Sequence, residues 1–209
     1  MRTLRVLPGR RVARAGVVAL VTAGWLLLGQ GAGFAAGGTN LLTNGDFESG
    51  GGSLTGWSAV RARLALAADG YNGGHAALAE LRGKKGDFGL TTSANPVVNA
   101  PAGETFAAAG VQRSASPGRP VCLVMREITP GGSTVQTAQQ CMTRTVTWTA
   151  FPAVSLTVQG AGDAVSVGVT SPQGVSGDSF EADALSLVNA DTTPPTVPAN
   201  VVATAPTST

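Results

Sequence analysis

The chain has 209 residues, of which 12% are charged, and its 14 basic and 12 acidic side chains give a formal net charge of +2. Glycine is frequent, and no stretch repeats Leu, Glu and Lys at helical spacing, which argues against long amphipathic helices and favours an all-β chain. Five arginines precede residue 36, so the remainder carries nine basic and twelve acidic side chains and leaves no net positive charge to hold nucleic acid.

Residues 1–35 have the three parts of a secretion signal. Arginines come first, an apolar run follows over residues 17–28, and small residues end the segment at Ala35 and Ala36. We therefore predict a signal peptide over residues 1–35, cleaved after Ala35 or Ala36, and a secreted, extracellular protein that has no membrane association afterwards. The alternative is an uncleaved anchor, although the apolar run is shorter than the roughly 20 residues that a membrane span needs.

Short runs of alternating apolar residues, separated by turn clusters, fill residues 40–189. Val165, Val167 and Val169 alternate as a half-buried strand requires. About ten strands at this spacing predict one all-β domain over residues 36–190, a jelly-roll β-sandwich. The expected strands cover residues 41–47, 58–67, 76–82, 87–92, 105–113, 121–128, 135–143, 148–158, 165–170 and 179–188.

The amino-acid composition changes at residue 191, where the sequence becomes rich in Pro and Thr. Pro194, Pro195 and Pro198 lack amide donors and fix φ, so residues 191–198 are expected to form an extended linker. Residues 199–204 resemble the first strand of a fibronectin type III domain. We assign residues 191–209 to a linker and the start of such a domain, and the alternatives are a longer chain or a disordered tail.

Two cysteines, Cys122 and Cys141, flank a predicted hairpin whose turn covers residues 129–134. Pairing Ile128 with Val135 also places Cys122 directly opposite Cys141. Side chains at opposite positions of an antiparallel pair are close enough for a disulfide, which would stabilise the fold by roughly 3 kcal/mol. A metal site or a catalytic thiol is the alternative, disfavoured by the single histidine and the absence of a CxxC motif.

The same register separates the two faces of the hairpin. One face is predicted to contain Arg126, Thr137 and Gln139 together with Val124 and the disulfide. This face would offer a strip of hydrogen-bonding groups on an open sheet, or else be an ordinary solvated face. The residues expected to face the core are Val121, Leu123, Met125, Ala138 and Met142.

Two motifs are more specific than the composition. One is NLLTNGDFES over residues 40–49, followed by Trp57, and the other is FEADALSLV over residues 180–188. Together with DGYNGGHAAL over residues 69–78 and TWTAF over 147–151, they resemble the cellulase-type carbohydrate-binding modules of families 4, 9 and 22, which have a galactose-binding-like jelly roll. This resemblance implies a non-catalytic module that binds a polysaccharide or oligosaccharide and holds a parent protein at it.

The resemblance also implies a structural calcium ion. The positions that match the family's ligands are Asp46, Glu48 and Asp183. Calcium takes six to eight oxygen ligands, so backbone carbonyls would complete the site. Ala184 stands where the family has a second aspartate, which removes one carboxylate. The alternative is that Asp46 and Asp183 cap turns.

Sugars usually bind to an aromatic ring flanked by polar groups, because a pyranose has an apolar face and a polar rim. Tyr71, in a loop rich in Gly and Asn, is the aromatic residue with a clear reason to be exposed. We predict that a sugar stacks on Tyr71 and accepts hydrogen bonds at the strip of Arg126, Thr137 and Gln139. The aromatic residues expected in the core, by resemblance, are Phe47, Trp57, Trp148 and Phe180.

Two other classes of function stay open. An enzyme, including part of a glycoside hydrolase precursor, would need a nucleophile and base or two placed carboxylates. His75 is the sole histidine, without an obvious partner, and no GxSxG motif occurs, so we expect no catalytic residues. A structural or adhesive β-domain without a sugar ligand is the second alternative. We expect a monomer.

Overall fold

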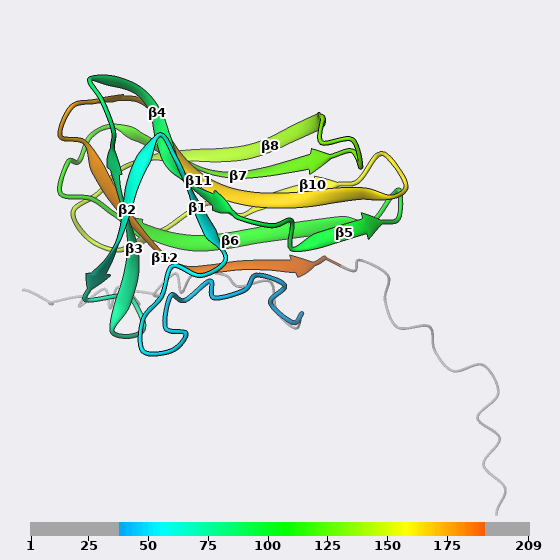
Figure 1. Ribbon diagram of the computed structural model, residues 1–209, viewed down its shortest axis with the longest axis horizontal. Coiled ribbons are helices and arrows are strands. Elements are labelled where there is room, and N and C mark those ends of the chain that lie inside the picture. Colours follow the sequence, from blue (N-terminus) through cyan, green and yellow to red (C-terminus); the bar gives the residue numbers. More distant parts are fainter. Residues whose placement is uncertain (1–37, 191–209) are drawn as a thin grey trace, which may run out of the picture.

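A computed structural model describes residues 38–190, which form two antiparallel β-sheets packed face to face (Figure 1). The predicted fold class, an all-β jelly-roll sandwich, is confirmed. The predicted signal peptide (1–35) and linker (191–209) lie outside the described residues. Within residues 38–190, no helix has the length and apolar character needed to cross a membrane.

Twelve strands make up the two sheets, six in each. The first sheet has the order β1 (Trp57–Val60), β4 (Lys85–Thr92), β11 (Asp163–Val175), β7 (Pro120–Ile128) and β8 (Thr134–Thr143), with β5 (Val97–Ala100) also paired to β11. The second sheet has the order β10 (Val154–Thr157), β6 (Thr105–Arg113), β12 (Ser179–Asn189), β3 (His75–Leu81) and β2 (Ala62–Ala68), with β9 (Thr149–Ala150) also paired to β6.

The core lies between the sheets and is made by alternation along the strands. Val165, Val167 and Val169 of β11 are fully buried, as their spacing predicts. Phe88 of β4 and Phe180 of β12 meet across the two sheets with ring centroids 5.5 Å apart. Burying a side chain of this size contributes about 1.5–3 kcal/mol, so such contacts hold the layers together.

The β7–β8 hairpin has the predicted register. Cys122 pairs with Cys141 and the two form a disulfide, which confirms that prediction. The turn differs in detail, because Ile128 pairs with Thr134 after a register shift and not with Val135. The residues expected in the core are there: Val121, Leu123 and Met125 are fully buried, while Ala138 and Met142 pack against the core from β8.

Residues 41–47 are not the predicted strand but a series of turns laid along β12. Asn44 and Phe47 have φ angles of 55° and 57°, which an extended strand does not allow. The Asn40 side chain joins this segment to β12, donating to the Leu185 carbonyl and accepting from the Leu187 amide. Two backbone hydrogen bonds, from the Leu41 amide to the Leu187 carbonyl and from the Leu185 amide to the Gly45 carbonyl, also join this segment to β12. The NLLTNGDFE motif therefore encodes a series of turns that we call the clasp, and the strand predicted from its alternating apolar residues is wrong.

Two predicted strands are each divided in the structure. Arg61 has a φ of 46° and separates β1 from β2, so residues 58–67 turn a corner and change sheets. Residues 148–158 are broken between β9 and β10 at Pro152, which has no amide to donate to a neighbouring strand. Among the remaining predicted strands, residues 105–113 match β6 at both ends and the others occur with shifted ends, while β5 was not predicted.

Candidate functional site

The loop between β2 and β3, residues 69–74, is fixed by carboxylates from distant parts of the chain. Asp183 of β12 accepts a hydrogen bond from the Tyr71 amide at 2.6 Å. Glu48, in the clasp, accepts from the His75 amide at 2.7 Å and lies 3.0 Å from the His75 ring nitrogen Nδ1. His75 thus has a partner that the sequence did not show, and the hydrogen bonds from His75 lower the pKa of Glu48.

This loop presents Tyr71 to solvent beside Trp148. Tyr71 is 39% exposed, and its ring centroid lies 6.1 Å from that of Trp148, edge to face. The guanidinium carbon of Arg113 lies 4.6 Å from the Trp148 ring centroid, within the range of a cation–π contact. We call Tyr71, Trp148 and Arg113 the aromatic platform.

Trp148 was expected in the core, and that expectation is wrong. Its side chain is only partly buried, because Trp148 directly precedes the two-residue strand β9 at the edge of the second sheet. At this edge the ring packs against Arg113 and Tyr71 and not between the sheets. The other three aromatic residues predicted for the core, Phe47, Trp57 and Phe180, are buried there.

Arg113 is held in place from two sides. Its Nε donates to Glu181 at 2.8 Å, and its two terminal nitrogens donate to the side chain and the backbone carbonyl of Asp69 at 2.9 Å. A guanidinium fixed by three hydrogen bonds loses little freedom when it meets a ligand. The arrangement places two rings, one cation and two carboxylates around one surface position, a set of groups suited to a polar ligand with an apolar face.

The three predicted calcium ligands lie near one another at the base of this loop. Burial raises the pKa of Asp183, and the negative charges of Glu48 and Asp46 raise it as well, while its amide hydrogen bonds lower it. Asp46 accepts from the Glu48 amide at 3.3 Å. A Cβ on Gly73 would collide with the Glu48 carboxylate, so glycine keeps this approach open.

The side chains alone do not complete a metal site. Among residues 38–190, no group of three or more His, Cys, Asp or Glu is spaced to hold an ion. Glu48 and Asp183 are also occupied with loop amides, which leaves each of them further lone pairs. A calcium ion here would therefore depend on backbone carbonyl oxygens for most of its ligands.

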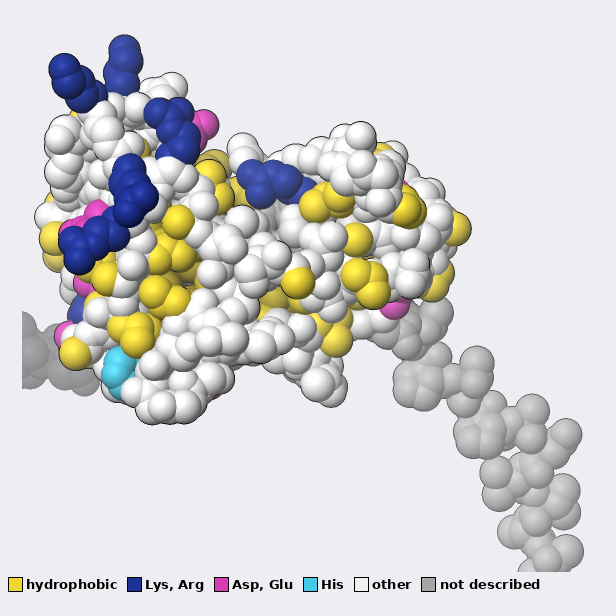
Figure 2. Space-filling model, in the orientation of Figure 1, with side chains coloured by type: hydrophobic (Ala, Val, Ile, Leu, Met, Phe, Trp, Pro, Cys, Tyr) yellow, Lys and Arg dark blue, Asp and Glu magenta, His cyan; other side chains and the backbone are white. Residues whose placement is uncertain are grey.

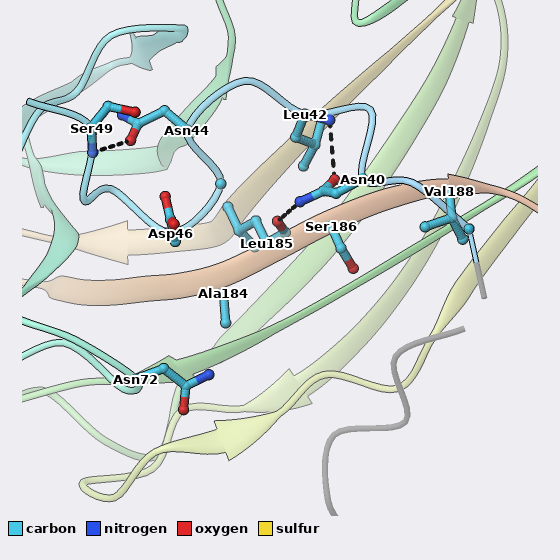
Figure 3. Close-up of a pocket in the computed structure, with 12 residues that line it drawn as sticks. Asn40, Leu42, Asn44, Asp46, Ser49, Asn72, Ala184, Leu185, Ser186 and Val188 are labelled. Atoms are coloured by element: carbon cyan, nitrogen blue, oxygen red, sulfur yellow. Dashed lines mark hydrogen bonds between the residues drawn. The ribbon is translucent and has the colours of Figure 1, made fainter. Parts of the chain in front are cut away.

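A cavity of about 500 Å³ adjoins this region between the clasp and β12 (Figure 3). Asn40 and Asn44 in its wall are engaged in holding the fold, since their side chains bond to backbone groups of β12 and of residues 49–55. Asp46 and Asn72 connect the cavity to the carboxylates and to the loop of Tyr71. Sequence reasoning missed this cavity because the turns of the clasp create it. Its polar lining is Asn40, Asn44, Asp46, Ser49, Asn72 and Ser186.

The remaining predicted ligand-binding residues form a separate strip on the outer face of the first sheet. Arg126 pairs with Thr137 across β7 and β8, and Gln139 lies opposite Val124 on the same face. We call Arg126, Thr137 and Gln139 the polar strip. The structure brings these three together but places Tyr71 on a loop of the other sheet, so the single site expected from the sequence is divided in two.

Comparisons with known proteins identify the fold. No family profile and no curated protein sequence matches the chain. Among solved structures, the xylan-binding module CBM22-1 of Paenibacillus barcinonensis Xyn10C is 19% identical with a TM-score of 0.56, covering 75% of this chain and 97% of that one. The CBM22-1–CBM22-2 tandem of the same protein gives 17%, a TM-score of 0.58 and coverages of 78% and 48%.

An enzyme domain also shares the fold. The enzymatically active domain of tailspike protein 4 of bacteriophage CBA120 is 10% identical with a TM-score of 0.55, and the match covers 72% of this chain. The chain spans only about a fifth of that domain, 21% of its length. At these identities the likeness shows the fold alone, and that fold is the jelly roll of carbohydrate-binding modules, as the motifs indicated.

Proposed function

We propose that the protein is a secreted, non-catalytic carbohydrate-binding module whose main sugar contact is the aromatic platform. The observation that carries this proposal is the pairing of Tyr71 and Trp148 at the surface, beside a guanidinium fixed by Asp69 and Glu181. The module would hold a parent protein at a polysaccharide. The disulfide supports an extracellular location, because such bonds persist in oxidising compartments.

The platform has the chemistry that a pyranose requires. The apolar face of a sugar ring packs on the exposed ring of Tyr71 or Trp148, while its hydroxyls reach the free oxygen atoms of Asp69 and Glu181. Each net hydrogen bond is worth only about 1 kcal/mol, so we expect micromolar to millimolar affinity that increases with the length of the glycan.

The polar strip is proposed as a second contact surface for the same polymer. Arg126 is partly exposed and Thr137 and Gln139 are exposed, so their donors are available to hydroxyl groups. No aromatic residue takes part in the strip, and hydrogen bonds to exposed groups compete with water. The strip is therefore expected to contribute less affinity than the platform.

A structural calcium ion at Asp46, Glu48 and Asp183 is also proposed. When bound, the ion would supply positive charge to a buried carboxylate whose two neighbours are acidic, which favours the ionised form of Asp183. Asp183 and Glu48 both bond to the loop that carries Tyr71. Occupation of this site would therefore order the platform without touching the polar strip.

Affinity electrophoresis tests the proposed function. The full chain is run in gels that contain xylan, β-glucan, cellulose, chitin or mannan, beside its Tyr71→Ala and Arg126→Ala variants. Retardation by at least one polysaccharide is expected. Tyr71→Ala should weaken it by about tenfold, equivalent to ~1.4 kcal/mol, and Arg126→Ala by less.

Val98→Ala is the matched control, since Val98 is 64% exposed on β5 and belongs to neither surface. Its mobility should equal that of the unmodified chain. Retardation by none of the polysaccharides would favour a structural or adhesive β-domain. Release of reducing sugar from any of them would instead favour a glycoside hydrolase.

A further inference from the structure

Five cationic side chains gather at the ends of β2 and β3 that are opposite to the loop of residues 69–74. Figure 2 shows Lys and Arg side chains concentrated at the end where β2, β3 and β4 lie in Figure 1. They belong to the β1–β2 corner and the β3–β4 turn, which are joined by a hydrogen bond from the Arg82 amide to the Arg61 carbonyl. We call this group the basic end, which consists of Arg61, Arg63, Arg82, Lys84 and Lys85, all exposed.

The net charge of the chain does not reveal this cluster, because acidic side chains elsewhere offset it. Residues 38–190 contain nine cationic side chains, and five of them, including both lysines of the chain, are at the basic end. The net charge counted from the sequence is correct, but it does not describe this part of the folded surface. Two carboxylates share these segments, Glu80 and Asp87, and Asp87 accepts from the Gln173 amide.

Four of the five cationic side chains at the basic end have no ion pair, whereas three of the four other cationic side chains in residues 38–190 have one. Arg113, Arg119 and Arg144 each form an ion pair with a carboxylate at 2.8–3.3 Å. At the basic end, the one ion pair among the described residues is Arg63–Glu80, at 3.6 Å and with both side chains well exposed. Such a pair contributes little, so most of the positive charge remains uncompensated.

The Arg61 side chain is held in place although its backbone conformation is an uncommon one. A φ of 46° is unfavourable for a long side chain, yet an arginine occupies the corner. Its guanidinium donates to the Lys85 carbonyl at 3.2 Å and lies directly over Gly86, where a Cβ would be 2.8 Å from a guanidinium nitrogen. Gly86 thus leaves room for a guanidinium that is held beside the two lysines.

We propose that the basic end binds the carboxylates of a uronic-acid polysaccharide, so that the glycan recognised by this module is anionic. The inference rests on the proposed carbohydrate-binding function and names the class of its ligand. Arginine and lysine match carboxylates in charge and hydrogen bonding, and an unpaired cluster attracts a polyanion over about a Debye length. One polysaccharide molecule can contact the basic end and the aromatic platform at the same time, since β2 and β3 separate these two surfaces by roughly 20 Å.

Nucleic acid is the other polyanion that such a cluster could attract. Binding of single strands normally adds aromatic rings on which bases stack, and the segments that carry the basic end, residues 60–63 and 81–87, contain no aromatic residue. The disulfide points to an extracellular compartment, where acidic glycans are available. These observations favour the glycan.

Binding of the full chain to polygalacturonate, measured by titration calorimetry beside neutral xylan, tests the proposal. We expect tighter binding to polygalacturonate, weakening steeply as salt rises from about 50 to about 200 mM. Lys84→Glu/Lys85→Glu should raise the Kd for polygalacturonate by about tenfold or more and leave binding to neutral glycans unchanged. Lys84→Arg/Lys85→Arg keeps the charge and is the matched control.

The outcomes distinguish failure of the anionic ligand from failure of the proposed carbohydrate-binding function. A neutral glycan that binds through Tyr71, with no preference for polygalacturonate, overturns the anionic ligand and leaves the proposed function intact. Equal binding of polygalacturonate by the Lys→Glu and unmodified chains also overturns it. Equal or tighter binding to single-stranded DNA or to vesicles with anionic lipid overturns the assignment to a glycan. Failure of every polysaccharide overturns both proposals.

Discussion

The aromatic platform and the polar strip are built in opposite ways. The strip consists of three residues of one hairpin, fixed by regular strand pairing and by a disulfide at one end. The platform joins Tyr71, Arg113 and Trp148, which come from three distant segments and are held by charged side chains. Because one surface depends on covalent and sheet structure and the other on electrostatics, different treatments should disturb each of them separately.

Removal of the disulfide should have the largest effect, and it should act on the strip. We expect Cys122→Ala/Cys141→Ala to lower the free energy of unfolding by about 3 kcal/mol, because the loop that the bond closes becomes free in the unfolded chain. Urea denaturation measures the loss. Reductant should destabilise the unmodified chain equally and leave the variant unchanged. Unfolding midpoints that coincide with and without the bond would mean that the sheet alone fixes the strip.

Removal of calcium should act on the platform. If calcium is present at about 100 times its Kd, it stabilises the fold by about 2.7 kcal/mol. A chelator should then lower the Tm by roughly 5–10 °C for a domain of this size. Asp183→Asn should abolish this response, whereas Arg126→Ala should retain it. A Tm that is the same in chelator and in saturating calcium would exclude the ion.

A buried carboxylate on the opposite face of β7 from the strip gives a smaller effect. Glu127 accepts from the amides of Gln159 and Gly160 and from the Gln136 side chain. Burial alone would raise the pKa of Glu127, but these hydrogen bonds lower it. Its stabilisation is therefore present at neutral pH and lost as the pH falls through the lowered pKa. Glu127→Gln should cost about 2 kcal/mol above that pKa, and less below it.

Asp163 serves as a control because its pKa is shifted in the opposite direction to that of Glu127. Burial raises the pKa of Asp163, and the hydrogen bond and the negative charge of Glu127 raise it further. Its contribution to stability is present while it is protonated and is lost as the pH rises through the raised pKa. Asp163→Asn, which cannot ionise, should be more stable than the unmodified chain at neutral pH and equal to it in acid. Thermal unfolding across pH measures both variants, and parallel pH profiles for the two would refute the assignment.

The polar strip and the aromatic platform also differ in how far they could be predicted from the sequence. The strip and the disulfide follow from alternation and turn position, which are local, so Arg126, Thr137, Gln139 and both cysteines were placed correctly on one face. Alternation failed for residues 41–47, where turns fixed by the side chains of Asn40 and Asn44 take the place of a strand. It also could not show the corner at Arg61, because the apolar pattern continues on both sides of it.

The platform was only half predictable. Tyr71 was identified from its glycine-rich loop, but nothing local connects it to Arg113 or Trp148. One signal was available: Glu181 alternates with the buried Phe180 and Ala182, so it had to lie on the outer face of the last strand. A cation at the paired position of the neighbouring strand stabilises a carboxylate on that face, and Arg113 on β6 pairs directly with Glu181. The basic end was missed because summed charge takes no account of position.

The clasp has a consequence for how the domain can be joined to other proteins. Gly38 lies against Val188, and the Ala190 amide bonds to the Thr105 carbonyl, so the first and last described residues sit side by side at one end of β12. A domain with neighbouring ends can be inserted into a loop of a host protein without stretching either connection. Glu181 and the platform lie at the other end of β12, roughly 20 Å away, so a host attached through these ends would leave the platform uncovered.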